Sequence, residues 1–386
     1  MKKVLFVHDG PIYQSDTNKY YGVDYNTELK NRYLYLGDHI TFLMRVKNLK
    51  TGMNLSYIEE DRFGVIPVPD FKSVKQHFTK KNEAKKVIEL AVTSHDFLII
   101  RLPSSIGLLA WEYAMKHSKP YIIELVACPW DGYISHSLLG KVVAPQMYLN
   151  TKKIVRNSPY VMYVSNDFLQ QRYPTSGNKL SCSDVTLPNL CEKNLMQRIE
   201  KIKNMKKGNP IVIGTVGSVA MKYKGQQYVI KAIQMLKKEG YNIEYHLVGG
   251  GDNSFLKRIA KRYDVENNIK YYGTLSHDKV IEFMKKIDIY IQPSNVESHG
   301  RVIIEAFSSA CPVIGSSTGG IPELVVPRYI FKRKNVQDLA RKIKNLIQSD
   351  LIEIGKANFY IAREFEQDKL NKKRFLFYDE FMKQEG

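Results

Sequence analysis

The sequence predicts an α/β protein built from two doubly wound, parallel-sheet domains. The chain has 386 residues, and because one domain commonly takes about 100–200 residues, this length fits two of them. Short β-branched and apolar runs alternate with amphipathic, helix-length segments in both halves, as in βαβ units. A polar, Lys-rich stretch at 188–208 separates the halves. We therefore expect one domain over 1–195, a second over 208–357, and a tail over 358–386.

The first half carries short apolar runs that end in polar residues, a pattern typical of buried parallel strands. The predicted strands are Val4–Val7, His39–Met44, Asp96–Arg101, Pro120–Val126 and Tyr160–Val164. Two of the intervening segments repeat apolar residues at helical spacing. These predicted helices are Thr79–Val92 and Leu108–His117.

The second half alternates more regularly, which favours one parallel sheet with crossover helices. Its predicted strands are Ile211–Val216, Ile243–Val248, Ile269–Tyr272, Ile287–Gln292 and Pro312–Ser316. Its predicted helices are Gln226–Glu239, Asn253–Asp264, Lys279–Lys286, Arg301–Ser309 and Val336–Ser349. The tail has aromatic residues at helical spacing, and we expect it to pack back on the first domain. Doubly wound sheets bind ligands at the carboxyl ends of their strands, here in a crevice between the domains.

The composition excludes several classes of protein. With 44% hydrophobic and 25% charged residues, the chain is neither disordered nor fibrous. No stretch approaches the roughly 20 apolar residues that span a bilayer. The apolar run at the N-terminus ends at Asp9, too early for the about 7–15 apolar residues of a signal peptide. The four cysteines are scattered without a CxxC pattern, which fits a reducing compartment. We therefore expect a cytoplasmic protein.

The net charge of +19 is the most unusual global property. Residues 1–200 contribute 26 Lys+Arg against 19 Asp+Glu, and the remainder 32 against 20, so the excess is spread over both halves. Diffuse basicity favours anionic partners, either nucleotides, lipid headgroups or nucleic acid. No zinc-finger, RRM or KH signature accompanies it.

The strongest motif lies between a predicted strand and the helix that follows it. Glu297 and Glu305 are eight residues apart, with Gly300 between them at the turn into the helix. A helix start presents unpaired N–H groups and the positive end of its dipole, so Gly300, Arg301 and Val302 form a phosphate seat. Glu305 is then placed to accept hydrogen bonds from ribose hydroxyls. The alternative is an ordinary helix start whose carboxylates compensate the dipole.

Other loops at the same predicted sheet edge carry small, polar or charged residues. Lys222 and Lys224-Gly225 follow the first strand of this half, and a Gly249-Gly250-Gly251 turn follows the second. Thr274 and Leu275 lie in the next loop, where they can wall in a base. A lysine or a glycine turn alone is a common surface feature, but together these loops favour a nucleotide site.

These segments together resemble one family. Residues 211–325 resemble the nucleotide-sugar-binding domain of retaining GT-B glycosyltransferases of the group-1 (family 4) class. The resemblance is carried by Glu297–Glu305, Lys224-Gly225, Gly249-Gly250-Gly251 and Thr318–Glu323, and more weakly by Val161–Pro174. It covers essentially the whole length. Ile122–Ser137, with Cys128-Pro-Trp-Asp131, is similar to enzymes that assemble bacterial capsule or other surface polysaccharides.

The resemblance implies two Rossmann-like domains that face an interdomain cleft. It also implies retaining transfer of a sugar from a nucleoside diphosphate to a glycan or lipid-linked acceptor, as in capsule, exopolysaccharide or other cell-surface glycan synthesis. The predicted catalytic residues are Glu297 and Lys224. By this resemblance, Glu297 contacts the hydroxyls of the donor sugar and Lys224 binds the diphosphate. Positive charge there stabilises the departing nucleotide. No metal and no other cofactor is implied.

The remaining predicted donor-binding residues surround this pair. They are Glu305 on the ribose, the backbone amides of Gly300, Arg301, Val302 and Ile303, and Lys222, Ser218, Gly249, Gly250, Thr274 and Leu275.

Two departures from the family pattern bear on the mechanism. Ser218 stands where the family usually has an Arg, and Lys222 replaces that charge only as a point charge without a bidentate fork. The stretch after Pro120–Val126 lacks the His that many members place near the reacting sugar.

The acceptor side is predicted in the first domain from residues near strand ends. These are Gly10, Arg101, Asp131 and His136. Arg101 either binds an anionic acceptor or pairs with a neighbouring carboxylate.

Other functions fit the same pattern less well. They are a non-catalytic GT-B subunit that supports a partner transferase, a nucleotide-sugar epimerase, and a nucleic-acid-binding protein. The sequence contains no motif that favours the last of these. The favoured partners are a nucleotide-diphosphate sugar, a glycan or lipid-linked acceptor, and an anionic membrane surface on the cytoplasmic side.

Overall fold

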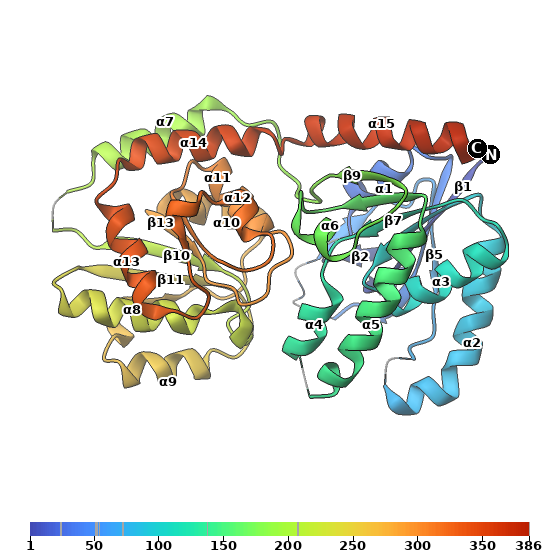
Figure 1. Cartoon of the computed structure of the whole chain (residues 1–386), viewed down its shortest axis with the longest axis horizontal. Helices are drawn as coiled ribbons and strands as arrows, with labels where there is room; N and C mark the ends of the chain where they lie inside the picture. The colour runs from blue at the N-terminus through green and yellow to red at the C-terminus, as the bar shows by residue number, and fades with distance from the viewer. Residues whose placement is uncertain are drawn as a thin grey trace. The chain divides into compact units, whose positions relative to one another are not determined.

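The computed structural model describes residues 1–23, 25–50, 53, 55–71, 73–136, 138–206 and 208–385, and gives the backbone alone for residues 74, 75, 77, 78, 136 and 138. The chain forms two compact α/β units (Figure 1). The first unit consists of Met1–Val164, Leu169–Cys182 and Asn371–Gly386. The second consists of Ser165–Phe168 and Ser183–Leu370.

The first unit is built on one largely parallel sheet. Its strands are β1 (Lys3–Gln14), β2 (Tyr20–Gly22), β3 (His39–Asn48), β4 (Ser56–Ile58), β5 (Phe63–Pro67), β6 (Phe97–Leu102), β7 (Tyr121–Leu125), β8 (Tyr160–Tyr163) and β9 (Asn178–Ser181). The parallel strands run in the order β5-β3-β1-β6-β7-β8-β9, and β2 and β4 add an antiparallel extension beside β1. Because β3 and β6 flank β1 on opposite sides, the winding direction reverses between β1 and β6.

Strand β1 is longer than the sequence predicts. The polar His8-Asp9-Gly10 segment resembles the turn that ends a strand, but in the structure it is an irregularity within one. Val7 pairs with Leu43 and Pro11 pairs with Arg45, so three residues of β1 lie opposite a single residue of β3. Pairing then resumes through Gln14. The continued ladder, which only the partner strand reveals, keeps the strand extended.

Helices cover the first sheet on both faces. They are α1 (Thr27–Tyr33), α2 (Val74–Thr93), α3 (Ser105–Lys116), α4 (Pro129–His136), α5 (Leu138–Asn157), α6 (Phe168–Arg172) and the part of α15 (Gln367–Glu385) from Asn371 on. Helix α3 packs on β1, β6, α2 and α5. Aromatic contacts hold α15: Phe375 stacks on Tyr35 at 4.1 Å between ring centroids, and Phe381 contacts Phe97 and Tyr160.

The second unit contains a fully parallel sheet. Its strands, in the order β12-β11-β10-β13-β14-β15, are β10 (Ile211–Val216), β11 (Ile243–Val248), β12 (Ile269–Tyr271), β13 (Ile289–Gln292), β14 (Val313–Ser316) and β15 (Ile330–Phe331). Its helices are α7 (Glu192–Lys203), α8 (Gln226–Lys238), α9 (Ser254–Arg262), α10 (His277–Lys286), α11 (Arg301–Ser308), α12 (Ile321–Leu324), α13 (Val336–Ile347) and α14 (Leu351–Arg363). The strands and helices predicted for residues 211–349 are confirmed to within two residues at each end.

The helices of the second unit form two layers, one on each face of the sheet (Figure 1). Helices α8, α9 and α13 pack together in one layer, and α10, α11, α14 and α7 in the other. The winding direction reverses between β10 and β13, so the loops after these two strands diverge and leave room for a ligand at the carboxyl edge.

Helix α7 lies within the stretch predicted to separate the domains, and a buried arginine attaches it to the second unit. The guanidinium of Arg198 donates to the carbonyls of Met284 and Ile287, both at 2.6 Å, and to that of Ser309 at 3.1 Å. These carbonyls lie at the C-terminal ends of α10 and α11, where no intrahelical partner remains. One side chain therefore satisfies both helix ends.

Replacing Arg198 by Met is expected to destabilise the second unit by about 3 kcal/mol, because it removes the donor from the buried carbonyls of Met284 and Ser309. The carbonyl of Ile287 keeps a hydrogen bond from Lys201 Nζ at 2.9 Å. Urea unfolding followed by fluorescence measures the change. Lys193→Met on the exposed side of α7 is the matched control and should change stability by less than about 0.5 kcal/mol. Equal effects of the two substitutions would show that the carbonyl contacts contribute nothing specific.

Candidate functional site

The carboxyl edge of the second sheet brings together the two residues predicted to carry the chemistry. Lys224 Nζ lies 3.3 Å from Glu297 Oε2, and both side chains are mostly buried, with 24% and 20% exposed. Gln292, the last residue of β13, donates from Nε2 to the same carboxylate oxygen at 3.1 Å. A carboxylate at this depth needs such partners, because burial without them disfavours its charge.

The orientation of the Gln292 amide follows from a fully buried tyrosine. Burial, with the charges of Glu297 and Glu305, raises the pKa of Tyr290, so its hydroxyl stays protonated. That hydroxyl donates to Gln292 Oε1. The amide nitrogen must therefore face the other way, where it donates to Ser294 Oγ at 2.8 Å and to Glu297. The hydrogen bond from Tyr290 therefore determines that Gln292 presents its amide nitrogen, and not its oxygen, to Glu297.

Two glycines allow the loops around Glu297 to approach one another. Gly225 has a φ of +79°, and a Cβ there would lie 1.9 Å from the carbonyl oxygen of Pro293. Gly319 has a φ of +54°, and its Cβ would lie 1.6 Å from the carbonyl oxygen of Glu297. A side chain at either position is incompatible with these distances. The Lys224 loop and the Thr318–Gly320 loop therefore press against the segment that carries Glu297.

Helix α11 begins at this edge, as the sequence predicts. Gly300 precedes it with a φ of +97°, and the first amides of a helix have no partner within the helix. The N–H of Ile303 already donates to the carbonyl of Gly300 at 2.9 Å. Of the four amides predicted to bind a phosphate, that of Ile303 therefore already has a partner within the chain. Glu305 is 13% exposed, and the imidazole Nε2 of His277 lies 3.6 Å from its Oε1.

The other predicted donor residues lie on the same sheet edge with different environments. Ser218 donates from Oγ to the carbonyl of Gly250 at 3.0 Å, which joins the loops after β10 and β11. Gly249 donates its N–H to the carbonyl of Gly273, so the loop with Thr274 and Leu275 lies beside them. Lys222 is exposed and stands over the Phe255 ring at 4.6 Å from its centroid.

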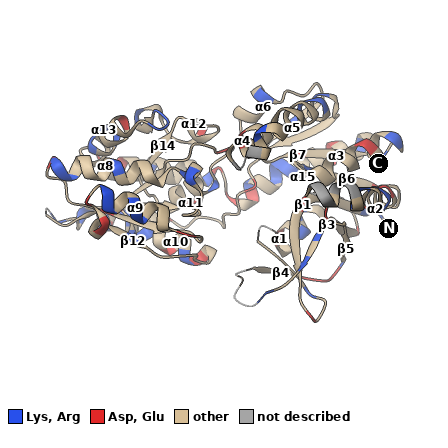
Figure 2. Cartoon of the chain, turned by 90° about the horizontal axis from the view of Figure 1, so that it is seen from below, with Lys and Arg blue, Asp and Glu red and all other residues tan. Residues whose placement is uncertain are grey.

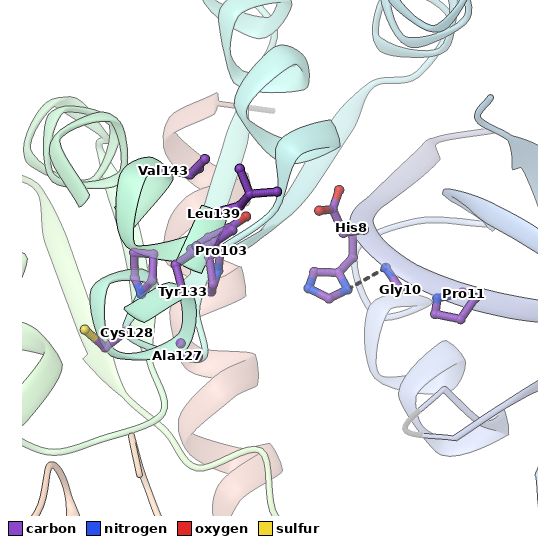
Figure 3. A pocket seen from close by; sticks show the side chains of 13 residues that line it. His8, Gly10, Pro11, Pro103, Ala127, Cys128, Tyr133, Leu139 and Val143 are labelled. Carbon is purple, nitrogen blue, oxygen red and sulfur yellow. Dashed lines mark hydrogen bonds between the residues drawn. The ribbon is translucent and has the colours of Figure 1, made fainter. Parts of the chain in front are cut away.

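The first unit has a cavity of about 590 Å³ at the corresponding edge of its own sheet. Its walls come from the irregular segment within β1 (His8–Pro11), from residues after β6 (Pro103) and after β7 (Ala127–Pro129), and from Tyr133 and the start of α5. It lies where the winding direction reverses between β1 and β6, which is the usual ligand position in such sheets. Figure 3 shows His8 and Gly10 across the cavity from Tyr133 and Leu139.

The predicted acceptor-side residues lie in different surroundings. Gly10 lines the cavity. Arg101 is buried, and its Nε lies 3.5 Å from Glu124 Oε2. Of the two alternatives that the sequence left open, Arg101 therefore pairs with a neighbouring carboxylate. Asp131, on α4, pairs with Arg172 at 2.9 Å. His136 ends α4, and its side chain lies outside the described residues.

Gln292 and His8 were not predicted as site residues. A polar side chain at the end of an otherwise apolar strand is a signal for Gln292, but only the tertiary structure shows its contact with Glu297. His8 lies in the segment that the sequence predicts to end the first strand, either as a glycine loop that faces the crevice or as an ordinary strand-to-turn junction.

No group of three or more His, Cys, Asp or Glu side chains is placed to hold a metal ion in the part of the chain that the structure describes. Within the same residues, no helix is long and apolar enough to cross a membrane.

Comparison with known proteins places the chain in a family. The model for "Glycosyl transferases group 1" matches residues 196–360. Protein CapJ of Staphylococcus aureus is 34% identical over 352 residues, which cover 90% of this chain and 87% of CapJ. The chain belongs to the group 1 glycosyltransferases. It is therefore a transferase of glycosyl groups, and the resemblance seen in the sequence is confirmed.

Two further similarities support the assignment. The putative colanic acid biosynthesis glycosyltransferase WcaL of Salmonella typhimurium is 26% identical over 179 residues, 43% of this chain and 44% of WcaL. The crystal structure of Anabaena Alr3699/HepE in complex with UDP has a TM-score of 0.68 at 17% identity, and the match covers 96% of this chain and 98% of HepE. The predicted GT-B fold is confirmed.

Replacing Gln292 by Leu in this glycosyltransferase is expected to lower kcat/KM for sugar transfer about tenfold, because Glu297 loses the donor that positions it. Thr215→Val, which removes a buried hydroxyl from neighbouring β10 without touching Glu297, is the control and should retain activity. Initial rates of transfer measure both variants. Full activity of Gln292→Leu would contradict the positioning role.

Proposed function

We propose that the enzyme is a retaining transferase that moves a sugar from a nucleoside diphosphate to a glycan or lipid-linked acceptor. Its biological setting is then the synthesis of a bacterial capsule, exopolysaccharide or other cell-surface glycan. The observation that carries the proposal is the Lys224–Glu297 pair beside the N-terminus of α11. The names of two similar proteins support it: HepE was crystallised with UDP-glucose, and WcaL is a putative colanic acid biosynthesis enzyme.

In this proposal the donor lies along the carboxyl edge of the second sheet. Lys224 and the first amides of α11 face the diphosphate, where the negative charge grows as the bond to the anomeric carbon breaks. Glu305 receives the ribose hydroxyls, and Glu297 receives hydroxyls of the donor sugar. Lys224 and the amides supply positive potential without a metal ion, so the proposed reaction requires none.

The donor site should respond to loss of its cation. Lys224→Ala is expected to lower sugar transfer at least about a hundredfold, because removing one group that stabilises transition-state charge typically costs about 10²–10³ in kcat. Glu305→Ala should weaken binding of the correct nucleoside diphosphate about tenfold, as expected for lost hydrogen bonds to a charged group. A thermal-shift screen against UDP, GDP, ADP and their sugars identifies the base first.

Matched controls separate these effects from instability. Lys257→Ala removes an exposed lysine of the same unit that stands over the Tyr271 ring and is not a predicted site residue, and it should retain most activity. Normal turnover in Lys224→Ala would remove the donor assignment. Nucleotide binding without any transfer or donor hydrolysis would favour the non-catalytic subunit, and isomerised donor in the absence of acceptor would favour the epimerase.

The proposed lipid-linked acceptor also requires a membrane surface, and helix α5 fits one. Leu139, Val142 and Leu149 are 71%, 76% and 62% exposed on this helix. Lys141, Lys152, Lys153 and Arg156 share it, and its sequence contains no Asp or Glu. Figure 2 shows further Lys and Arg on helices of both units. Exposed apolar side chains among cations suit the interface of an anionic bilayer, here its cytoplasmic face.

The double variant Val142→Ser/Leu149→Ser is expected to bind phosphatidylglycerol-containing vesicles several-fold more weakly than the wild type, because it removes buried apolar area at the interface. Co-sedimentation measures the bound fraction. Leu90→Ser, at a residue 71% exposed on α2, is the matched control. Equal binding to neutral and anionic vesicles would rule out the electrostatic part of this proposal.

A further inference from the structure

The first unit has a second cavity, of about 570 Å³, that the proposed function does not use. It lies along one side of each of two helices that contact each other. The residues that line it recur at the spacing i, i+3, i+4 and i+7, which marks a single face of a helix. They are Ser105, Leu108, Leu109 and Glu112 on α3, and Val143, Gln146, Met147 and Asn150 on α5. We call this cavity the α3–α5 trough.

Helix α2 and the segment before it contribute a third side of the trough. Lys81 of α2 and Phe71, which precedes that helix, are among the lining residues. Helix α3 contacts both α2 and α5, so it forms the middle of this helix layer (Figure 1). The seven residues from Ser105 to Glu112 extend the trough over about 10 Å, because an α-helix rises about 1.5 Å per residue. An elongated ligand fits this shape better than a compact one.

Burial divides the lining into an apolar floor and a polar rim. Phe71, Leu109 and Met147 are buried, with 5%, 8% and 6% of their surfaces exposed. The exposed lining residues include polar Glu112 and Gln146. Methionine adapts to irregular chains, because its thioether side chain is unbranched and flexible. The cross-section of the trough, apolar below and polar above, therefore matches the two parts of an amphiphile.

The charges in the trough do not select an ion. Among the described residues that line it, Lys81 is the cation and Glu112 is the carboxylate. One charge of each sign gives the lining no net attraction for an anion or a cation. The affinity of a ligand must then come mainly from the apolar surface that it buries, and it rises with each CH₂ group placed on the floor.

The trough adjoins two other features of the first unit. Tyr133 and Val143 line both the trough and the cavity of about 590 Å³ at the sheet edge (Figure 3). Val142, the neighbour of Val143 on α5, is 76% exposed, and Leu139, one turn earlier, is 71% exposed. The trough is therefore continuous with the apolar side chains of α5 that fit the interface of a bilayer. In the proposed membrane-bound state, a hydrocarbon chain can pass from the bilayer to the floor of the trough over apolar side chains.

We propose that the α3–α5 trough binds one aliphatic chain of an amphiphile, with Phe71, Leu109 and Met147 in contact with the chain. The inference rests on the proposed function in one respect, since the membrane that supplies the amphiphile is part of that proposal. The chain belongs either to a bilayer phospholipid or to the lipid of a lipid-linked acceptor, and both present hydrocarbon to the trough. The bound chain holds the first unit to the membrane in addition to the surface of α5.

A series of alkanols tests the proposal on the full chain. Butan-1-ol, hexan-1-ol and octan-1-ol differ only in their number of CH₂ groups, and calorimetric titration measures the affinity of each. Every added pair of CH₂ groups that reaches the floor is expected to tighten binding about fifteenfold. A constant affinity along the series would contradict the burial of a chain.

A pair of tryptophan variants locates the bound chain. Gln146 lines the trough but is exposed, so the indole of Gln146→Trp occupies the trough without disturbing the buried floor. This variant should bind octan-1-ol at least about tenfold more weakly, as expected for the loss of two CH₂ contacts. Leu149→Trp places the same indole on α5 at a residue that is 62% exposed and does not line the trough, and it should bind octan-1-ol like the wild type. Equal losses in both variants, or no loss in Gln146→Trp, would place the alkanol elsewhere and overturn the proposal.

Two further probes identify the source of the chain. Farnesyl phosphate carries a single isoprenoid chain, and dioctanoyl phosphatidylglycerol carries the two acyl chains of a bilayer lipid. Both are titrated below their micelle concentrations. Tighter binding of farnesyl phosphate, lost in Gln146→Trp, assigns the chain to the lipid of an acceptor. Tighter binding of the phosphatidylglycerol, lost in the same variant, assigns it to the bilayer.

Nucleotide binding separates this inference from the proposed function. UDP and GDP are titrated into the same samples, and their binding reports on the donor site and on folding. A wild type that binds nucleotide but no alkanol would overturn the inference and leave the proposed function standing. Alkanol binding in the trough without nucleotide binding or sugar transfer would overturn the proposed function and leave the trough as a binding site for aliphatic chains.

Discussion

A partly buried carboxylate requires cationic or hydrogen-bonding partners, and the edge of the second sheet is organised around meeting this requirement for Glu297. Lys224 and Gln292 both reach its Oε2, and buried Tyr290 determines how Gln292 is turned. The loop that carries Lys224 reaches this position only because Gly225 lets it press against Pro293. The site therefore depends on strand order, backbone approach and side-chain polarity together.

The first unit contains a carboxylate in the opposite situation. Asp9 accepts from two hydroxyls and one backbone amide and lies beside Arg45, so its bonds join β1 to α3 and are part of the fold. The environment thus assigns different roles to two acidic residues, Asp9 within β1 and Glu297 after β13. The same reasoning places Arg101 in the interior, where Glu124 compensates its charge and Tyr33 donates to that carboxylate at 2.7 Å.

The net charge of +19 has more than one origin in the structure. Lys224 belongs to the candidate donor site, and Arg198 is buried, where it donates hydrogen bonds to carbonyls at the ends of two helices. The cations of α5 lie among exposed apolar residues on a helix without acidic ones. Charge counted over the whole chain could not distinguish these roles, because burial and neighbours decide them and neither is visible in composition.

The sequence by itself determined the fold class, the parallel strands of residues 211–316 and the motif from Glu297 to Glu305, because periodicity and glycine placement are local properties. The end that the sequence predicts for β1 is too early, since only pairing with β3 shows that the strand continues beyond Gly10. The tertiary structure alone decided that Gln292 meets Glu297, that Arg101 is internal and that His8 lines a cavity. Each of these depends on strand order or register, which brings together residues that the local pattern cannot relate.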